Sequence, residues 1–319
     1  MKIVVPDDYQ DMVHRLSCFS LLDGHEVTRY REPAGDLDHL VERLHPAEVV
    51  VAIRERVDFS RALIERLPNL RLIALVGRAA TTIDVAACQD HNVLVSTGAS
   101  NSPHAPAELT VALMLAARRN IVVEAERMRR GEWPCTLSHR LAGSTLGIFG
   151  LGTIGSLVAR AGAGLGMNVL AWGQSASAER ARVAGYEFAV SKAELFERSD
   201  VLSLHLRLRP DTRGIVGPDD LARMKTTALI VNTSRAELIQ PNALLAGLRA
   251  GRPGYAAVDV YEQEPIMAGD HPFLRMSNVV CTPHLGWAEW DNFELYFREA
   301  FEQIAAYAAG QPLRLMKRA

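Results

Sequence analysis

Polar residues that can bind an anion or move a proton follow three apolar runs in the last third of the chain. Arg235 follows the first run, Asp259 and Glu264 follow the second, and His284 follows the third. Arginine presents a planar pair of donors that fits a carboxylate, and histidine can exchange a proton near neutral pH. A carboxylate beside that histidine would favour its protonated form. Together these residues predict a site that binds an acid and moves a proton, although each alone could be an ordinary surface residue.

A glycine-rich turn precedes these three segments. Gly150, Gly152 and Gly155 have the spacing G-x-G-x-x-G between an apolar run and a helical pattern. In such a turn the first glycine allows a tight bend, and the second lets the backbone approach a pyrophosphate. The third lets the helix pack closely on the strand. Unpaired N–H groups at the start of the helix favour phosphate. The motif therefore predicts a dinucleotide site, and the alternative is a turn that serves packing alone.

The next apolar run should end near the adenosine ribose of that dinucleotide. An acid at this position usually bonds the ribose hydroxyls and repels a 2′-phosphate. Here Gly173, Gln174 and Ser175 follow the run, so no acid is present, and the two polar side chains can bond a hydroxyl or a phosphate. Arg180 and Arg182 are the nearest cations, and their helical pattern favours solvent-facing side chains. We expect the cofactor to be NAD or NADP, with NADP preferred or near parity.

Short apolar runs alternate with amphipathic segments along the whole chain, which is the pattern of parallel sheets with helical crossovers. Strands are expected at 3–5, 49–53, 72–76, 93–95, 146–149, 169–172, 201–204, 228–231, 256–260 and 279–281. Long helices are expected at 107–119 and 289–309. Because ligands bind outside the carboxyl ends of such strands, the polar residues described above should converge.

Composition excludes several classes of protein. The 35 Lys and Arg residues nearly balance 37 Asp and Glu, so the chain lacks the basic excess of a nucleic-acid binder. The four cysteines have neither zinc nor C-x-x-C spacing, which predicts no metal centre and a reducing environment. The apolar stretch 141–172 contains the glycine turn, so we interpret it as strand–helix–strand rather than a membrane span. The chain also begins without the layout of a signal peptide. We expect a cytoplasmic protein with no nucleic-acid or membrane partner.

Over essentially its whole length the sequence resembles the D-isomer-specific 2-hydroxyacid dehydrogenase family. The matching stretches are 77–84, 106–110, 146–155, 205–214, 224–239, 256–265 and 282–286. The resemblance implies the α/β class, with two Rossmann-like or flavodoxin-like doubly wound parallel-sheet domains and a cleft between them. It implies a discontinuous substrate domain from 1–99 and 287–319, and a dinucleotide-binding domain from 100–286.

The resemblance also implies an oxidoreductase that reduces a 2-oxo acid to a D-2-hydroxy acid with NADH or NADPH. Arg235 would hold the substrate, Glu264 would pair with the histidine, and His284 would be the acid–base. With Gln174 and Ser175, the expected cofactor contacts are Gly150, Gly152, Thr153, Ile154, Gly155, Leu206, Thr233, Ser234, Arg235, Asp259, His284 and Gly286. The expected substrate contacts are Gly77, Arg78, Ala79 and Arg235. Small substrates such as glyoxylate or hydroxypyruvate, and a homodimer, are further expectations.

Three positions depart from the family pattern. Gly173 replaces the ribose-binding acid, and Ala236 replaces the glycine that usually follows the arginine. Arg78 and Ala79 stand where many members have a small pair of residues near the substrate carboxylate. An extra cation there favours a larger or doubly acidic substrate, unless only the backbone of Arg78 takes part.

Two other functions remain open. The family includes phosphoglycerate and formate dehydrogenases, and the chain end at residue 319 leaves no room for a C-terminal regulatory module, which weighs against the first. The same fold also serves as a nucleotide-sensing corepressor that binds partner peptides. The catalytic set does not separate that binding protein from an enzyme.

Overall fold

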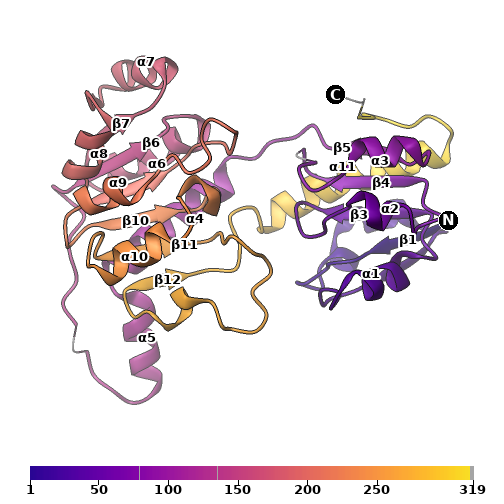
Figure 1. The fold of residues 1–319 in the computed structure, drawn as a ribbon, viewed down its shortest axis with the longest axis horizontal. Coiled ribbons are helices and arrows are strands. Elements are labelled where there is room, and N and C mark those ends of the chain that lie inside the picture. The colour runs from indigo at the N-terminus through magenta and orange to yellow at the C-terminus, as the bar shows by residue number, and fades with distance from the viewer. Residues whose placement is uncertain (79, 135, 317–319) are drawn as a thin grey trace. The chain divides into compact units, whose positions relative to one another are not determined.

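The computed structural model describes residues 1–78, 80–134 and 136–316, which form two α/β units (Figure 1). Unit 1 combines Met1–Ser102 with Glu289–Ala319, and unit 2 is Pro103–Ala288. The sequence placed these boundaries after residues 99 and 286, a few residues earlier. Ala79, one of the expected substrate contacts, lies outside the described residues.

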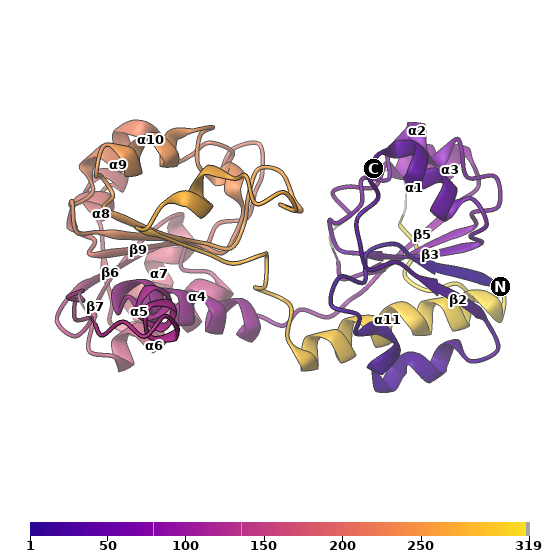
Figure 2. The same cartoon turned by 90° about the horizontal axis from the view of Figure 1, so that it is seen from below.

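Unit 1 contains a five-stranded parallel sheet in the order β2-β1-β3-β4-β5, which is the flavodoxin-type order. Its strands are β1 Lys2–Val5, β2 Glu26–Arg29, β3 Val49–Ile53, β4 Leu72–Val76 and β5 Leu94–Thr97. Its helices are α1 Leu37–Leu44, α2 Arg61–Ile64, α3 Val85–Asp90 and α11 Trp290–Ala308, with 3-10 turns η1 Val13–Arg15 and η2 Ser17–Leu22. Helices α1 to α3 cover one face, and α11 covers the other (Figure 2).

The core of unit 1 follows directly from its sequence. All five residues of β3 and all five of β4 are buried, as expected for strands that are covered on both faces. Helix α11 buries Phe297, Phe301 and Ile304 against this sheet. Because both ends of the chain contribute to this unit, its core is complete only when the last helix has packed.

Unit 2 contains a seven-stranded parallel sheet in the order β12-β11-β10-β9-β6-β7-β8. Its strands are β6 Thr145–Phe149, β7 Asn168–Trp172, β8 Glu187–Phe188, β9 Val201–Leu204, β10 Leu229–Asn232, β11 Tyr255–Val258 and β12 Val279–Cys281. Its helices are α4 His104–Arg118, α5 Ile121–Arg129, α6 Thr153–Gly164, α7 Ser175–Ala184, α8 Lys192–Arg198, α9 Pro218–Arg223 and α10 Ala243–Arg249, with 3-10 turns η3 Ala236–Leu238 and η4 Pro272–Arg275. Counted from β6, this is the Rossmann order with one further strand.

Helices lie on both faces of the unit 2 sheet, with α4 and α6 on one side and α8 to α10 on the other (Figure 2). The expected fold class is therefore confirmed in both units. The stretch 141–172 forms β6, α6 and β7. Within the described ranges, no helix combines the length and the apolar character needed to cross a membrane.

Candidate active site

The turn between β6 and α6 has the geometry of a phosphate-binding loop. Gly150 has φ +98°, and its N–H donates to the Trp172 carbonyl at 2.9 Å. A Cβ on Gly150 would lie 2.8 Å from the His205 carbonyl oxygen, and one on Gly155 would collide with the Gly150 carbonyl. These two glycines are required by conformation and close packing, as the motif predicts.

Gly152 has the opposite surroundings, because a Cβ placed there would meet no atom within 4 Å. It is the N-cap of α6, and no side chain caps this helix. The turn therefore offers open space together with the N–H groups of an uncapped helix, which suits an anion. Leu206 closes one wall, since its Cδ2 would lie 2.8 Å from a Cβ on Gly150. These features fit the pyrophosphate of a dinucleotide.

No acid stands at the end of β7, and the packing of Gly173 gives a structural reason for its absence. A Cβ on Gly173 would lie 2.9 Å from Ser177 Oγ and 3.3 Å from Ser177 Cβ, so packing against α7 restricts this position. Gln174 and Ser175 are exposed at the start of α7. The adenosine end of the site is therefore neutral on the β7 side.

The structure confirms that both nearby arginines are exposed, and it adds a contact for one of them. Arg180 bends back so that its Nε donates to the Leu151 carbonyl within the phosphate turn, although the side chain remains exposed. The Leu151 carbonyl offers an acceptor that the helical pattern alone could not reveal. Arg182 is exposed as expected and pairs with Glu179 at 2.6 Å. Arg180 thus brings a cation to the phosphate turn, whereas Arg182 does not.

The turn after β10 is held by its own side chains. Ser234 Oγ donates to the Leu204 carbonyl at the end of β9, at 2.7 Å. Thr233 Oγ1 lies 2.7 Å from Thr110 Oγ1 on α4. Arg235 follows at once, and its Nη1 donates to the Ser234 carbonyl at 2.7 Å. The half-buried Arg235 side chain therefore leaves the sheet edge from a fixed backbone.

His284 and Glu264 form the closest acid–base pair at this edge. His284 Nδ1 lies 2.6 Å from Glu264 Oε2, with the two side chains 25% and 31% exposed. Glu264 Oε1 also accepts the Tyr261 N–H at 2.9 Å, so both carboxylate oxygens are oriented. His284 has φ +52°, a strained conformation for a residue other than glycine. Such strain is concentrated at functional sites, where the surrounding structure holds it.

Asp259 holds the turn that carries His284. Its fully buried carboxylate accepts Thr282 Oγ1 at 2.7 Å, the Leu285 N–H at 2.7 Å and the Gly286 N–H at 2.8 Å. Burial raises the pKa of Asp259, and these three hydrogen bonds oppose the rise. The sequence suggested a cofactor contact at Asp259, and the geometry shows in addition that it positions the histidine turn.

In unit 1, the expected substrate residues follow β4. Gly77 is buried with φ +112°, and the Arg78 side chain is exposed. Sequence reasoning missed Arg54, which follows β3 directly and has φ +50°. Arg54 Nη1 lies 3.4 Å from where a Cβ on Gly77 would be, so this guanidinium is packed beside the Gly77 turn. An arginine placed directly after an apolar run was the available signal.

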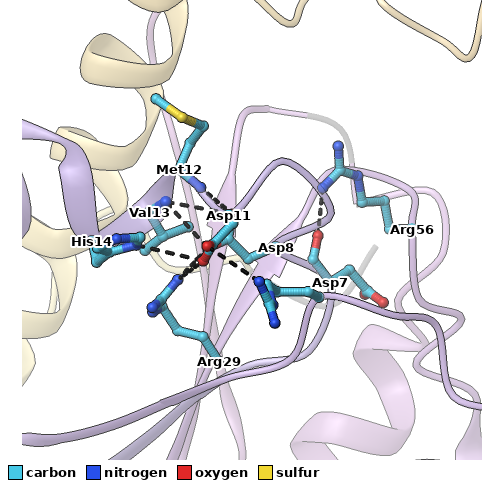
Figure 3. Close-up of polar contacts among 9 residues, drawn as sticks. Asp7, Asp8, Asp11, Met12, Val13, His14, Arg29 and Arg56 are labelled. Atoms are coloured by element: carbon cyan, nitrogen blue, oxygen red, sulfur yellow. Dashed lines mark hydrogen bonds and ion pairs between the residues drawn. The ribbon is translucent and has the colours of Figure 1, made fainter.

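Asp8, Asp11 and His14 in unit 1 have the residue types of a metal site, and their ligand atoms lie within 4.8 Å of one another. Arg29 Nη1 donates to Asp8 and to Asp11, each at 2.8 Å (Figure 3). The Asp8 carboxylate also accepts the Met12 N–H at 3.0 Å. The arginine already supplies the positive charge that these carboxylates require.

Comparisons with known proteins agree with this geometry. Residues 111–286 match the model of the D-isomer specific 2-hydroxyacid dehydrogenase NAD binding domain. The glycerate dehydrogenase of Methylorubrum extorquens is 32% identical over 92% of each chain. A phosphoglycerate oxidoreductase structure from Vibrio cholerae is 45% identical, with a TM-score of 0.94, over 97% of this chain and 99% of that one.

The D-3-phosphoglycerate dehydrogenase of Methanocaldococcus jannaschii is 38% identical over 78% of this chain, which spans only 47% of that relative's length. The fold and the phosphate turn define a dinucleotide-dependent oxidoreductase. The chain belongs to the D-isomer-specific 2-hydroxyacid dehydrogenase family, which confirms the resemblance seen in the sequence.

Proposed function

We propose that this chain reduces a 2-oxo acid to a D-2-hydroxy acid, with His284 as the proton donor. The observation that carries this proposal is the 2.6 Å contact between His284 Nδ1 and Glu264 Oε2 at the carboxyl edge of an NAD-binding sheet. The contact occupies Nδ1, so Nε2 is the ring atom that gives the proton to the developing alkoxide. Glu264 holds the imidazole ring in position for that transfer.

The other residues bind and orient. Arg235 holds the substrate carboxylate through its guanidinium fork, and Asp259 keeps the histidine turn in place. The nicotinamide, when bound, supplies the hydride. The residues implied by the family, from Gly150 to Gly286, would hold the cofactor around the phosphate turn and the β10 turn. Preorganised charge at the reacting carbonyl is the protein's main contribution to the rate.

For the cofactor, we propose that NADPH is accepted at least as well as NADH. The end of β7 offers no acid to repel a 2′-phosphate, and Gln174 and Ser175 are exposed neutral hydrogen-bonding groups. Comparing kcat/KM for NADH and NADPH with one substrate tests this. A preference for NADH above about 100-fold, roughly 2.7 kcal/mol, would contradict it.

The substrate class is tested by a panel of glyoxylate, hydroxypyruvate and 3-phosphohydroxypyruvate with both cofactors. A small 2-oxo acid is the first candidate. Arg54 beside Gly77 and the exposed Arg78 favour a doubly acidic substrate as the second candidate. If that is correct, Arg78→Gln should raise KM for the phosphorylated substrate about 10-fold or more, while Arg66→Gln, a distant exposed arginine of unit 1, should not.

The same panel separates an enzyme from a nucleotide-sensing corepressor. Oxidation of NADH or NADPH with any 2-oxo acid in the panel supports the enzyme. Unchanged absorbance throughout, together with peptide binding, would favour the corepressor.

We further propose a cytoplasmic homodimer built through the α5 arm, which is formed by the described residues 121–134 with 136 and 137. Helix α5 buries none of its residues, and it is followed by exposed apolar side chains. Met128, Trp133 and Leu137 are 69%, 82% and 96% exposed. Large exposed apolar side chains along one segment are typical of an interface, and a second copy would cover them symmetrically. Sedimentation should show a dimer that Trp133→Asp disrupts and Val190→Asp, on an exposed residue outside the arm, does not.

A further inference from the structure

We propose that Arg180 and Arg207 together bind the 2′-phosphate of NADPH, from opposite sides of β6. The inference rests on the proposed binding of a dinucleotide at the phosphate turn. It adds Arg207, which the sequence motifs did not single out, and it gives Arg180 a partner.

The loop after β9 brings Arg207 to the phosphate turn. β9 pairs with β6, and the His205 N–H donates to the Phe149 carbonyl at 2.9 Å. The His205 carbonyl and the Leu206 side chain both lie 2.8 Å from where a Cβ on Gly150 would be. Arg207 is the next residue, so its side chain starts from a loop that is packed against the turn.

Hydrogen bonds fix the backbone at Arg207, whereas the Arg207 side chain is exposed. Thr212 Oγ1 donates to the Arg207 carbonyl at 2.6 Å and accepts the Arg209 N–H at 2.8 Å. A cation on a loop that is fixed by hydrogen bonds loses less conformational freedom on binding than one on a mobile loop. Arg207 therefore suits a specific anion.

Neighbouring arginines show which cations are already compensated. Arg182 pairs with Glu179 at 2.6 Å, and Arg209 pairs with Asp211 at 3.2 Å. Across residues 1–78, 80–134 and 136–316, neither Arg180 nor Arg207 forms an ion pair with a carboxylate. Two uncompensated guanidinium groups thus remain at this edge, and both have donors suited to a phosphate.

Topology explains why the two arginines would serve the ribose end. The strand order β9-β6-β7 places the phosphate turn, which follows β6, between the loops that follow its neighbours. In this fold the adenosine ribose lies beside the end of the second strand, here β7. Arg180 comes from α7 on the β7 side, and its Nε is already bonded to Leu151 of the turn. Arg207 comes from the β9 side, so the two arginines would contact a 2′-phosphate from the β7 side and from the β9 side.

The test is calorimetric and needs no turnover. The probes are adenosine 2′,5′-bisphosphate and adenosine 5′-monophosphate, which differ only by the 2′-phosphate. The wild-type protein should bind the bisphosphate about 10-fold or more tightly, as charge-assisted hydrogen bonds provide. Arg207→Gln should reduce this ratio about 10-fold with little change in affinity for the monophosphate. Arg180→Gln should do the same, and Arg180→Lys should retain part of the preference.

The chain offers matched controls, since Arg182→Gln and Arg209→Gln change paired arginines on the same helix and the same loop. These controls should leave the ratio unchanged. Equal wild-type affinity for the two probes would overturn the proposal, as would equal effects in the controls. Loss of affinity for both probes alike in Arg207→Gln would also overturn it, because the cation would then serve the 5′-phosphate. If the wild type prefers the bisphosphate as predicted but reduces no 2-oxo acid, the proposed function is wrong and the proposal for the two arginines stands.

Discussion

The first strand of each unit is followed by a turn in the same topological position, but the two turns are filled differently. In unit 2, the turn after β6 leaves open space at Gly152 and an uncapped helix. In unit 1, β1 is followed by Asp8, whose carboxylate accepts the Met12 N–H at 3.0 Å and the Val13 N–H at 3.2 Å. Arg29, at the end of β2, donates to Asp8 at 2.8 Å.

The difference shows how one architecture can be a ligand site in one unit and a structural feature in the other. Both turns present backbone donors at the carboxyl end of a first strand. Unit 1 supplies the anion from its own chain, together with a cation from its second strand. Unit 2 supplies no anion of its own, so its donors remain available to a pyrophosphate.

Removing the cation from unit 1 should have the largest effect. Arg29→Gln leaves the fully buried Asp8 carboxylate without its charged partner and should cost about 3–5 kcal/mol of unfolding free energy. Denaturant unfolding measures this. Arg31→Gln, at a residue 68% exposed, is the control and should cost under about 1 kcal/mol. Equal losses would show that Asp8 does not depend on Arg29.

Giving the unit 2 turn an anion of its own should imitate unit 1. Gly152→Asp places a carboxylate where a Cβ meets no atom within 4 Å, so folding should persist. Affinity for NADH should fall by about 100-fold or more, roughly 2.7 kcal/mol, because the carboxylate repels the pyrophosphate. Fluorescence titration measures this. Gly164→Asp, at the far end of α6 and also in open space, should bind normally. Unchanged affinity in Gly152→Asp would place the dinucleotide elsewhere.

Asp7, next to Asp8, makes the stability of unit 1 depend on pH. Burial raises the pKa of Asp7 to about 6, opposed by the Tyr9 hydroxyl and by Arg56. Because the folded-state pKa lies above the unfolded value, its contribution to stability is full below about pH 4 and is lost as pH rises through about 6. Between pH 5 and pH 8 the wild type should lose on the order of 1.5 kcal/mol from this group, about half of its whole contribution.

Asp7→Asn should remove that part of the pH dependence. Denaturant unfolding from pH 5 to pH 8 compares the slopes of the two proteins. Asp38→Asn, on an exposed aspartate of unit 1, should keep the wild-type slope. A wild-type slope in Asp7→Asn would mean that another group titrates.

Glu264→Gln should have the smallest effect of these changes. Loss of the carboxylate 2.6 Å from His284 Nδ1 leaves the ring with a neutral partner, so the proton donor is held less well. The kcat for reduction should fall about 10-fold, roughly 1.4 kcal/mol, while the affinity for NADH is unchanged. An unchanged kcat would show that the pair does not act together in the reaction.

Much of the fold could be predicted because buried parallel strands are continuous apolar runs. β3, β4, β9 and β12 begin and end where the sequence placed them. The edge strands β2 and β8 were missed, since their residues alternate in exposure or number only two. Pattern reading identifies strands by continuous apolar runs, which the edge strands β5 and β12 have and the edge strands β2 and β8 lack.

Motifs selected the candidate site residues, but they could not show which contacts hold them in place. The role of Asp259 beneath the histidine turn and the return of Arg180 to Leu151 are contacts between segments far apart in sequence. Arg54 was missed because nothing in its local sequence connects it with Gly77. Such relations depend on tertiary packing, which spacing along the chain does not encode.

The central claim is that His284 gives the proton at the carboxyl edge of unit 2, and His284→Ala tests it most directly. The variant should still bind NADH but show kcat reduced by about 100-fold or more, as loss of a general acid predicts. His139→Ala, at an exposed histidine of the same unit, should retain full activity. Wild-type turnover in His284→Ala with the accepted 2-oxo acid would contradict the account.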